Sequence, residues 1–334
     1  MDYLAKSNHF MNSSVPPPTS SLSNSLGLKV VPFALYRIEG ERRCKGPGYL
    51  FTNFYDAKDQ KNYADVYTHI DPSPVSFSPF VSFFMARVDS VRAEVGIRSI
   101  DNPFQIRNLL VREVSKEEVL REANILYDTL PCIIPAETGN LWDPLPQTKE
   151  AFQKQGVFRI VSLGDSISND LLNGLGHLQI EQKCPGLHLE IVHANGPEKE
   201  ARKYNSPAVL DRLVSSHHPD LLMIGGMSHD PDSVRSIVQK CRKRQPSLEV
   251  LYFDASLNGD PHRTKRLNEL KLYKHYGKEE NFAVIDYSSP FQQTIQKGSQ
   301  PLAWYQRDHV HANDRGKQLL SRLFAGSFLE GLPS

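Results

Sequence analysis

Residues 160–168 read IVSLGDSIS, an apolar run that ends in Gly164, Asp165 and Ser166. The apolar residues predict a short buried strand, and residues 167–176 predict a helix directly behind it. Ser166 is therefore expected at the carboxyl end of a strand in an open α/β sheet, where such sheets form their sites. Its N–H would lie at a helix N-terminus and stabilise nearby negative charge, although a serine in this place could also be a simple helix cap.

The sequence around Ser166 alternates between strand and helix patterns. Apolar segments predict strands at residues 158–163, 187–192, 221–224, 250–253 and 282–285. Ser206 and Pro207 form an N-cap and first-turn pair for one helix, and apolar residues at helical spacing predict others at 234–244 and 319–328. Repeated β-α units of this length imply a parallel sheet in a three-layer α/β/α sandwich.

The earlier part of the chain has a different pattern. From residue 29 to 114, β-branched and aromatic segments alternate with turn residues, which predicts a mainly-β, sandwich-like domain. Ser115 to Glu118 has the form of a capping box, so one helix is expected to follow it. The predicted organisation is a flexible leader at 1–28, a β-rich domain at 29–145 and a catalytic domain at 157–334, with the polar stretch 144–156 as the boundary.

A histidine that could activate Ser166 lies just before the last predicted helix. Residues 307–316 read RDHVHANDRG, in which Asp308 and His311 are three residues apart. A serine hydroxyl is a poor nucleophile and needs a general base. A carboxylate this close in sequence can fix the imidazole tautomer and stabilise the imidazolium, so these three residue types together suit a serine hydrolase.

The chain from about Phe158 to the C-terminus resembles the SGNH (GDSL-type) hydrolase superfamily. The matches to its first and last signatures, G-D-S and D-x-x-H followed by N-x-x-G, are Gly164-Asp165-Ser166 and Asp308, His311, Asn313 and Gly316. The resemblance implies that Ser166 is the nucleophile, His311 the general base and then acid, and Asp308 its orienting partner.

The same resemblance implies an oxyanion hole, formed by the N–H groups of Ser166 and Gly196 and by one side chain. Gly196 matches the glycine of the second signature, although the Asn-Gly pair there is also an ordinary turn signal. The third signature, G-x-N-D, is not matched, because Ser228 stands where the asparagine is expected. Either Ser228 or His229 would have to replace the amide, and losing one oxyanion donor typically costs ~2.7–4 kcal/mol of barrier lowering.

Charge and hydropathy give no reason to expect a nucleic-acid partner or a membrane span. Lys and Arg (39) balance Asp and Glu (38), so no overall field attracts nucleic acid or an anionic membrane. No run approaches the ~20 apolar residues that span a bilayer. Residues 1–26 contain no recognisable signal peptide, which is consistent with a soluble cytoplasmic protein as written or a secreted one after trimming.

The four cysteines, Cys44, Cys132, Cys184 and Cys241, form no metal-binding spacing. Buried free thiols are the prediction, and a Cys44–Cys132 disulfide is the alternative for a secreted protein. No metal or cofactor is expected.

A β-sandwich ahead of an SGNH domain resembles the arrangement of some carbohydrate esterases. The resulting hypothesis is a serine esterase that removes small acyl groups, most plausibly acetyl, from a glycan through an acyl-enzyme on Ser166. Two alternatives stay open: an O-acyltransferase with the same residues, and a non-catalytic glycan-binding protein with a decayed site. The acyl group, the acceptor, the role of the first domain and the oligomeric state are left open by the sequence.

Overall fold

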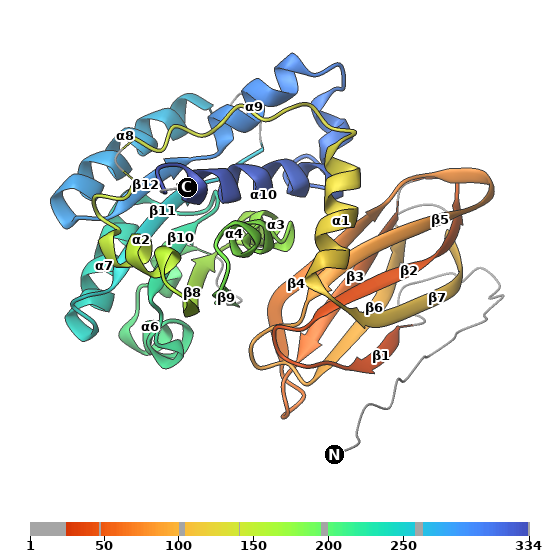
Figure 1. The fold of residues 1–334 in the computed structure, drawn as a ribbon, viewed down its shortest axis with the longest axis horizontal. Helices are drawn as coiled ribbons and strands as arrows, with labels where there is room; N and C mark the ends of the chain where they lie inside the picture. The colour runs from red at the N-terminus through yellow and green to blue at the C-terminus, as the bar shows by residue number, and fades with distance from the viewer. Residues whose placement is uncertain are drawn as a thin grey trace. The chain divides into compact units, whose positions relative to one another are not determined.

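The computed structural model describes residues 25–46, 48–99, 104–139, 141–194, 200–257 and 263–332 (Figure 1). Within these ranges the chain forms two compact units. One reaches to Glu122, apart from residues 62–64, and the other begins at Ala123. Most of the predicted leader lies outside the described residues, but its end does not, because the first strand begins at Leu26.

The first unit consists of two β-sheets. One has the strand order β1-β6-β3-β4 and the other has the order β5-β2-β7. The bounds of the strands are β1 Leu26–Lys29, β2 Leu35–Cys44, β3 Gly48–Tyr55, β4 Lys61–Ile70, β5 Ser73–Met85, β6 Arg92–Ser99 and β7 Phe104–Val114. β6 runs antiparallel to β1 and β3, and β2 runs antiparallel to β5 and β7.

Apolar side chains from both sheets meet in one core. Phe54 and Val95 belong to the first sheet, whereas Ile38 and Phe84 belong to the second, and all four are almost completely buried in one cluster. The Phe84 ring stacks on Tyr36 at 5.1 Å between centroids. Two antiparallel sheets with a shared core form a β-sandwich, which confirms the predicted class of this unit.

Helix α1 (Lys116–Tyr127) begins where the capping-box pattern predicts, and Ser115 Oγ accepts a hydrogen bond from Glu118 N at 3.3 Å. The division between the two units falls inside α1, earlier than the predicted boundary.

The segment after α1 forms hydrogen bonds with the rest of the second unit. Ile134 N donates to Thr294 Oγ1 at 2.9 Å, and Trp142 Nε1 donates to Glu330 O at 2.7 Å. The predicted linker 144–156 contains helix α2 (Pro146–Gln153).

The second unit is built on a parallel sheet with the order β12-β11-β10-β8-β9. Its strands are β8 Gly156–Gly164, β9 Leu187–His193, β10 Leu221–Gly225, β11 Glu249–Asp254 and β12 Ala283–Asp286. The chain passes from β8 to β9 in one direction and then returns to β10 on the other side of β8. The carboxyl ends of β8 and β10 therefore flank the topological switch point, where open α/β sheets bind ligands.

Helices cover both faces of this sheet. Because β-α-β crossovers are right-handed, the reversal at β8 puts the helices between β8 and β9 on the opposite face from those between β9 and β12. The helices between β8 and β9 are α3 Ser166–Asn173 and α4 His177–Lys183, and α10 Asp314–Leu329, which follows β12 and α9 Ser288–Lys297, packs against both of them. The helices between β9 and β12 are α5 Ala201–Tyr204, α6 Pro207–Leu213, α7 Pro231–Arg244 and α8 Arg263–Glu280. The result is the predicted three-layer α/β/α fold, and it is the fold that the resemblance to SGNH hydrolases implies.

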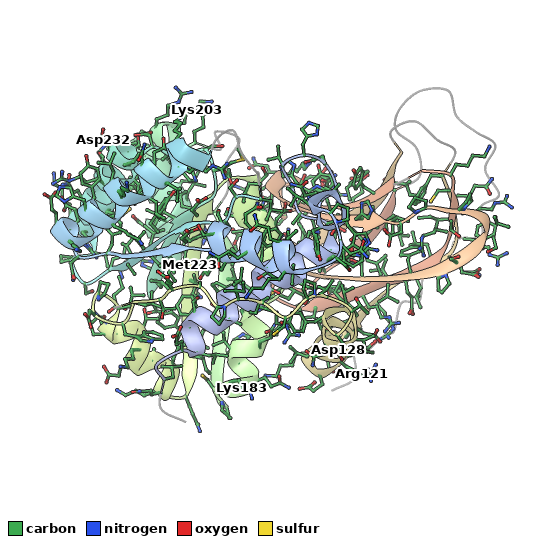
Figure 2. The ribbon with its side chains drawn as sticks, turned by 90° about the horizontal axis from the view of Figure 1, so that it is seen from above. Arg121, Asp128, Lys183, Lys203, Met223 and Asp232 are labelled. Carbon is green, nitrogen blue, oxygen red and sulfur yellow. The ribbon has the colours of Figure 1, made fainter. Side chains whose placement is uncertain are left out.

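Figure 2 shows Met223 of β10 in the interior of this unit and Lys183, Lys203 and Asp232 at its surface. Met223 has no exposed surface. Among the helices described, none is long and apolar enough to cross a membrane. All four cysteines are free thiols, so the alternative Cys44–Cys132 disulfide is not formed. Cys44 and Cys241 are buried as predicted, whereas Cys184 is half-buried and Cys132 is exposed.

Candidate active site

Ser166 is the first residue of α3, directly after the end of β8. The N-cap of this helix is Asp165, whose Oδ1 accepts hydrogen bonds from Ile167 N at 2.9 Å and Ser168 N at 3.4 Å. Ser166 is therefore not the helix cap, and its hydroxyl is available for another partner. Its N–H belongs to the first turn of α3, where backbone donors have no partner within the helix.

The hydroxyl of Ser166 meets His311. Ser166 Oγ lies 2.8 Å from His311 Nε2, and His311 Nδ1 lies 2.8 Å from Asp308 Oδ2. An ionised carboxylate can only accept hydrogen bonds, so Nδ1 carries the proton and Nε2 is left as an acceptor for the serine hydroxyl. The structure thus brings Ser166, His311 and Asp308 into one hydrogen-bonded chain in the order that activates a serine.

Asp308 is held in its ionised form. Burial alone would raise the pKa of this carboxyl, but hydrogen bonds from His311 N and Val310 N, each 2.8 Å from Oδ1, outweigh it and keep the pKa below its ordinary value of 3.8. The imidazole side chain of His311 contributes in the same direction. Asp308 is consequently an anion at neutral pH and fixes the tautomer of His311.

Asn313 and Gly316 fix the loop behind His311. Asn313 Oδ1 accepts from Arg315 N at 3.0 Å and caps α10, while its Nδ2 donates to Trp304 O at 2.8 Å. A Cβ on Gly316 would lie 2.3 Å from Tyr305 O, so only glycine allows this packing.

The two aromatic residues ahead of Asp308 are placed differently. Tyr305 is completely buried, whereas the ring of Trp304 packs under the guanidinium of Arg315 at 4.3 Å. Tyr305 is therefore a packing residue of the loop rather than a wall of an open pocket.

Asp165 also connects two loops at the switch point, which the sequence pattern does not predict. Its Oδ2 accepts from Met227 N at 2.8 Å and Ser228 N at 2.9 Å. Gly226 has φ +125°, and a Cβ there would lie 2.1 Å from Asp165 Oδ1. In the sequence, the pair Gly225-Gly226 ahead of Met227 is a local signal that could have indicated this close approach.

Of the predicted oxyanion donors other than Ser166, the structure describes only the candidates on the loop after β10. Gly196 lies outside the described residues. Ser228 is exposed, and its N–H is used by Asp165, which leaves only its hydroxyl as a donor. His229 is buried, its Nδ1 accepts from Ala201 N at 3.0 Å, and its Nε2 lies 2.7 Å from Gly225 O. Both ring nitrogens of His229 are thus engaged in the fold, which argues against His229 as the replacement for the amide.

Asp254, at the carboxyl end of β11, is a further titratable group at this edge of the sheet. Burial raises its pKa to about 6, and the carboxylate of Asp286, its register partner on β12, adds to the shift against an opposing effect of Arg266. Among the described residues no cluster of three or more metal-ligating side chains occurs.

Asp254→Asn is expected to stabilise the second unit at neutral pH. The pKa of Asp254 in the folded state lies above its ordinary value of 3.8, so the folded state binds this proton more tightly than the unfolded state does. The free energy of unfolding therefore falls as the pH rises from about 4 to 6, and above pH 6 the ionised carboxylate destabilises the fold to its full extent. A shift of this size corresponds to about 2 kcal/mol after an allowance for partial exposure. Urea unfolding followed by tryptophan fluorescence reports on this unit, because Trp142 and Trp304 both belong to it. An equal gain at pH 4 and pH 7.5 would contradict the electrostatic explanation.

No protein-family model matches the sequence, and no curated protein matches it. Similar solved structures exist. One is a two-domain esterase (CEX) active on acetylated mannans, with 14% identity and a TM-score of 0.47 over 59% of this chain and 55% of that chain. The chain thus spans little more than half the length of that esterase.

Two further similar structures are smaller proteins. One is a putative GDSL-like lipase from Parabacteroides merdae, with 14% identity and a TM-score of 0.36 over 54% of this chain and 98% of that chain. The other is Axe2, an acetylxylan esterase from Geobacillus stearothermophilus, with 16% identity and a TM-score of 0.41 over 53% of this chain and 95% of that chain. Similarity at this level concerns the fold alone.

Proposed function

We propose that the second unit is a serine ester hydrolase that forms an acyl-enzyme on Ser166. The observation that carries this proposal is the chain of hydrogen bonds from Asp308 through His311 to Ser166 Oγ, at the carboxyl edge of a parallel sheet. Nucleophile, base and orienting acid lie within hydrogen-bond reach of one another before any substrate is bound. A hydroxyl that only stabilised the fold would not need an imidazole whose other nitrogen is held by a carboxylate.

The proposed reaction has two halves. Ser166 Oγ attacks the ester carbonyl carbon while His311 Nε2 takes its proton, and the developing oxyanion is stabilised by the N–H of Ser166 at the N-terminus of α3. The N–H of Gly196 and the hydroxyl of Ser228 are the further candidate donors. His311 then passes the proton to the leaving alcohol oxygen, which breaks the ester C–O bond and leaves the acyl group on Ser166.

Water completes the cycle. His311 takes a proton from water as the water oxygen attacks the acyl carbon, and the proton returns to Ser166 Oγ when the acid leaves. Asp308 stays ionised and stabilises the imidazolium in both halves. This chemistry requires neither a metal ion nor an organic cofactor.

A small acyl ester on a carbohydrate is the proposed substrate class. The side chains of His311 and Asp308 are 24% and 41% exposed, so solvent reaches both of them. Catalytic side chains that solvent reaches suit a short acyl group carried by a bulky hydrophilic molecule better than a long-chain lipid. The β-sandwich ahead of the catalytic unit supports the same class by analogy with carbohydrate esterases.

The direct test is covalent labelling combined with hydrolysis. A fluorophosphonate is expected to add once per chain, on Ser166, as located by peptide mass spectrometry. 4-Nitrophenyl acetate is expected to be hydrolysed faster than the butyrate ester, and acetylated glycans to release acetate. Labelling elsewhere, or none, would contradict the proposal. Recovery of the acyl group on an added sugar, in place of free acid, would support the acyltransferase instead.

A further inference from the structure

Helix α3 carries an acidic residue, Asp170, on the same side as Ser166. Asp170 follows Ser166 by one helical turn, and residues at this spacing lie on one face of a helix. Asp170 is only 3% exposed. A buried carboxylate on the helix that carries the nucleophile requires partners.

Both partners of Asp170 belong to the loop that carries His311. Asp170 Oδ1 accepts from Arg307 Nη1 at 2.8 Å, and Oδ2 accepts from Ala312 N at 2.9 Å. Arg307 directly precedes Asp308, and Ala312 directly follows His311. One carboxylate therefore holds both ends of the segment that contains the base and its orienting acid.

The loop is also closed on itself. Arg307 N donates to His311 O at 3.0 Å, and Arg307 Nη1 donates to Ala312 O at 3.1 Å. Gln306 and Ala312 form an antiparallel bridge. These contacts fix the conformation of the loop. Its hydrogen bonds to Asp170 on α3 then determine the position of the loop relative to Ser166.

The ion pair between Asp170 and Arg307 is buried, with the two side chains 4% and 8% exposed. The loss of water around two such charges offsets much of their attraction, so a buried ion pair is weak evidence of a role in stability. Its geometric effect is clearer, because a shift of the loop by even 1 Å would lengthen the 2.8 Å contact between His311 Nε2 and Ser166 Oγ.

We propose that Asp170 and Arg307 form a positioning pair that holds His311 at hydrogen-bond distance from Ser166 by clamping the 307–312 loop to α3. The inference rests on the proposed function of the site. Neither residue touches the reacting atoms. Both act through the loop.

The test compares Asp170→Asn and Arg307→Ala with the wild-type protein. Each variant is expected to lower kcat for 4-nitrophenyl acetate by about 10²-fold, with KM nearly unchanged, and to slow fluorophosphonate labelling in proportion. Ethylguanidinium added to Arg307→Ala is expected to restore part of the lost kcat, because it can occupy the place of the missing guanidinium. Arg307→Lys retains the charge and provides a milder variant if the alanine variant does not fold.

Glu249→Gln is the matched control. Glu249 is a buried carboxylate at the amino end of β11, remote from the strand ends that carry the site, and it accepts from Gln147 N at 2.6 Å and Thr148 N at 2.7 Å. It should lower the melting temperature as Asp170→Asn does but leave kcat unchanged. Equal effects of the two variants on kcat, or no effect of Asp170→Asn, would overturn the proposal.

A spectroscopic readout separates this inference from the proposed function. The proton shared by His311 Nδ1 and Asp308 is expected to give a downfield proton resonance in the wild-type protein, whether or not an ester is hydrolysed. Asp170→Asn is expected to broaden or lose that resonance, whereas Glu249→Gln should keep it. An inactive wild type would contradict the proposed function alone, and an unchanged resonance in Asp170→Asn would contradict the positioning role.

Discussion

Ser166→Ala and His311→Ala are each expected to lower kcat for 4-nitrophenyl acetate by about 10⁴- to 10⁶-fold. Ser166→Ala removes the atom that becomes acylated, and His311→Ala removes the base that lies 2.8 Å from it. Because the two groups act as a unit, the double variant is expected to lose little more than either single variant. Stopped-flow and steady-state assays of the three proteins, with fluorophosphonate labelling in parallel, measure these losses.

His309→Ala is the control for the histidine variant. His309 lies on the same loop, two residues from His311, and is exposed. Its removal is expected to leave kcat unchanged. Full activity in Ser166→Ala, or a loss in His309→Ala that equals the loss in His311→Ala, would refute the assignment of nucleophile and base.

Gly226→Ala is expected to have the second largest effect, on both stability and activity. The new Cβ would lie 2.1 Å from Asp165 Oδ1, and φ +125° is a conformation that residues with side chains rarely adopt. Asp165 would have to move, and with it the start of α3 and the Met227 loop that it holds. We expect a loss of about 2–4 kcal/mol in the free energy of unfolding and about 10²-fold in kcat.

Gly156→Ala is the control that separates the effect of backbone strain from the effect of displacing Asp165. Gly156 has φ +139°, yet a Cβ there has no heavy atom within 4 Å. It should therefore cost about 1–2 kcal/mol of backbone strain and leave kcat unchanged. If the two glycine variants lost activity to the same degree, the close contact with Asp165 would not explain the role of Gly226.

The features that could be predicted from the sequence are those that neighbouring residues specify. Strands β8 and β10 are buried on both faces of the sheet, so each appears in the sequence as a continuous apolar run. Such a run can be recognised as a strand before its neighbouring strands are known. The turn from β8 into α3 and the spacing of Asp308 and His311 are also local. These segments account for the correct fold class of the second unit and for the juxtaposition of Ser166 with His311.

The features that could not be predicted depend on residues distant in sequence. Asp170 and Arg307 are 137 residues apart in the sequence. Glu249, whose carboxylate accepts hydrogen bonds from the first turn of α2, lies about a hundred residues after that helix. Leu145, at the N-cap of α2, provides no side-chain cap, so Pro146 in the first turn is the start signal that the cap position leaves this helix. Helix α8 has apolar residues spread around its circumference, which hides the periodicity on which a prediction depends.

The attachment of the segment from Ile134 to Thr148 determines where the second unit can be cut. A fragment that began at the predicted domain start, residue 157, would remove the two N–H groups that satisfy Glu249 and leave that carboxylate buried without them. It would also uncover the faces on which Phe152 and Leu145 now pack. Arg322 also donates to Asn124 Oδ1, and Ile133 N donates to the hydroxyl of Tyr127, so these bonds reach back into α1. A piece of the second unit that retains them therefore starts at Ala123 or earlier, and expression or crystallisation of this unit should begin there.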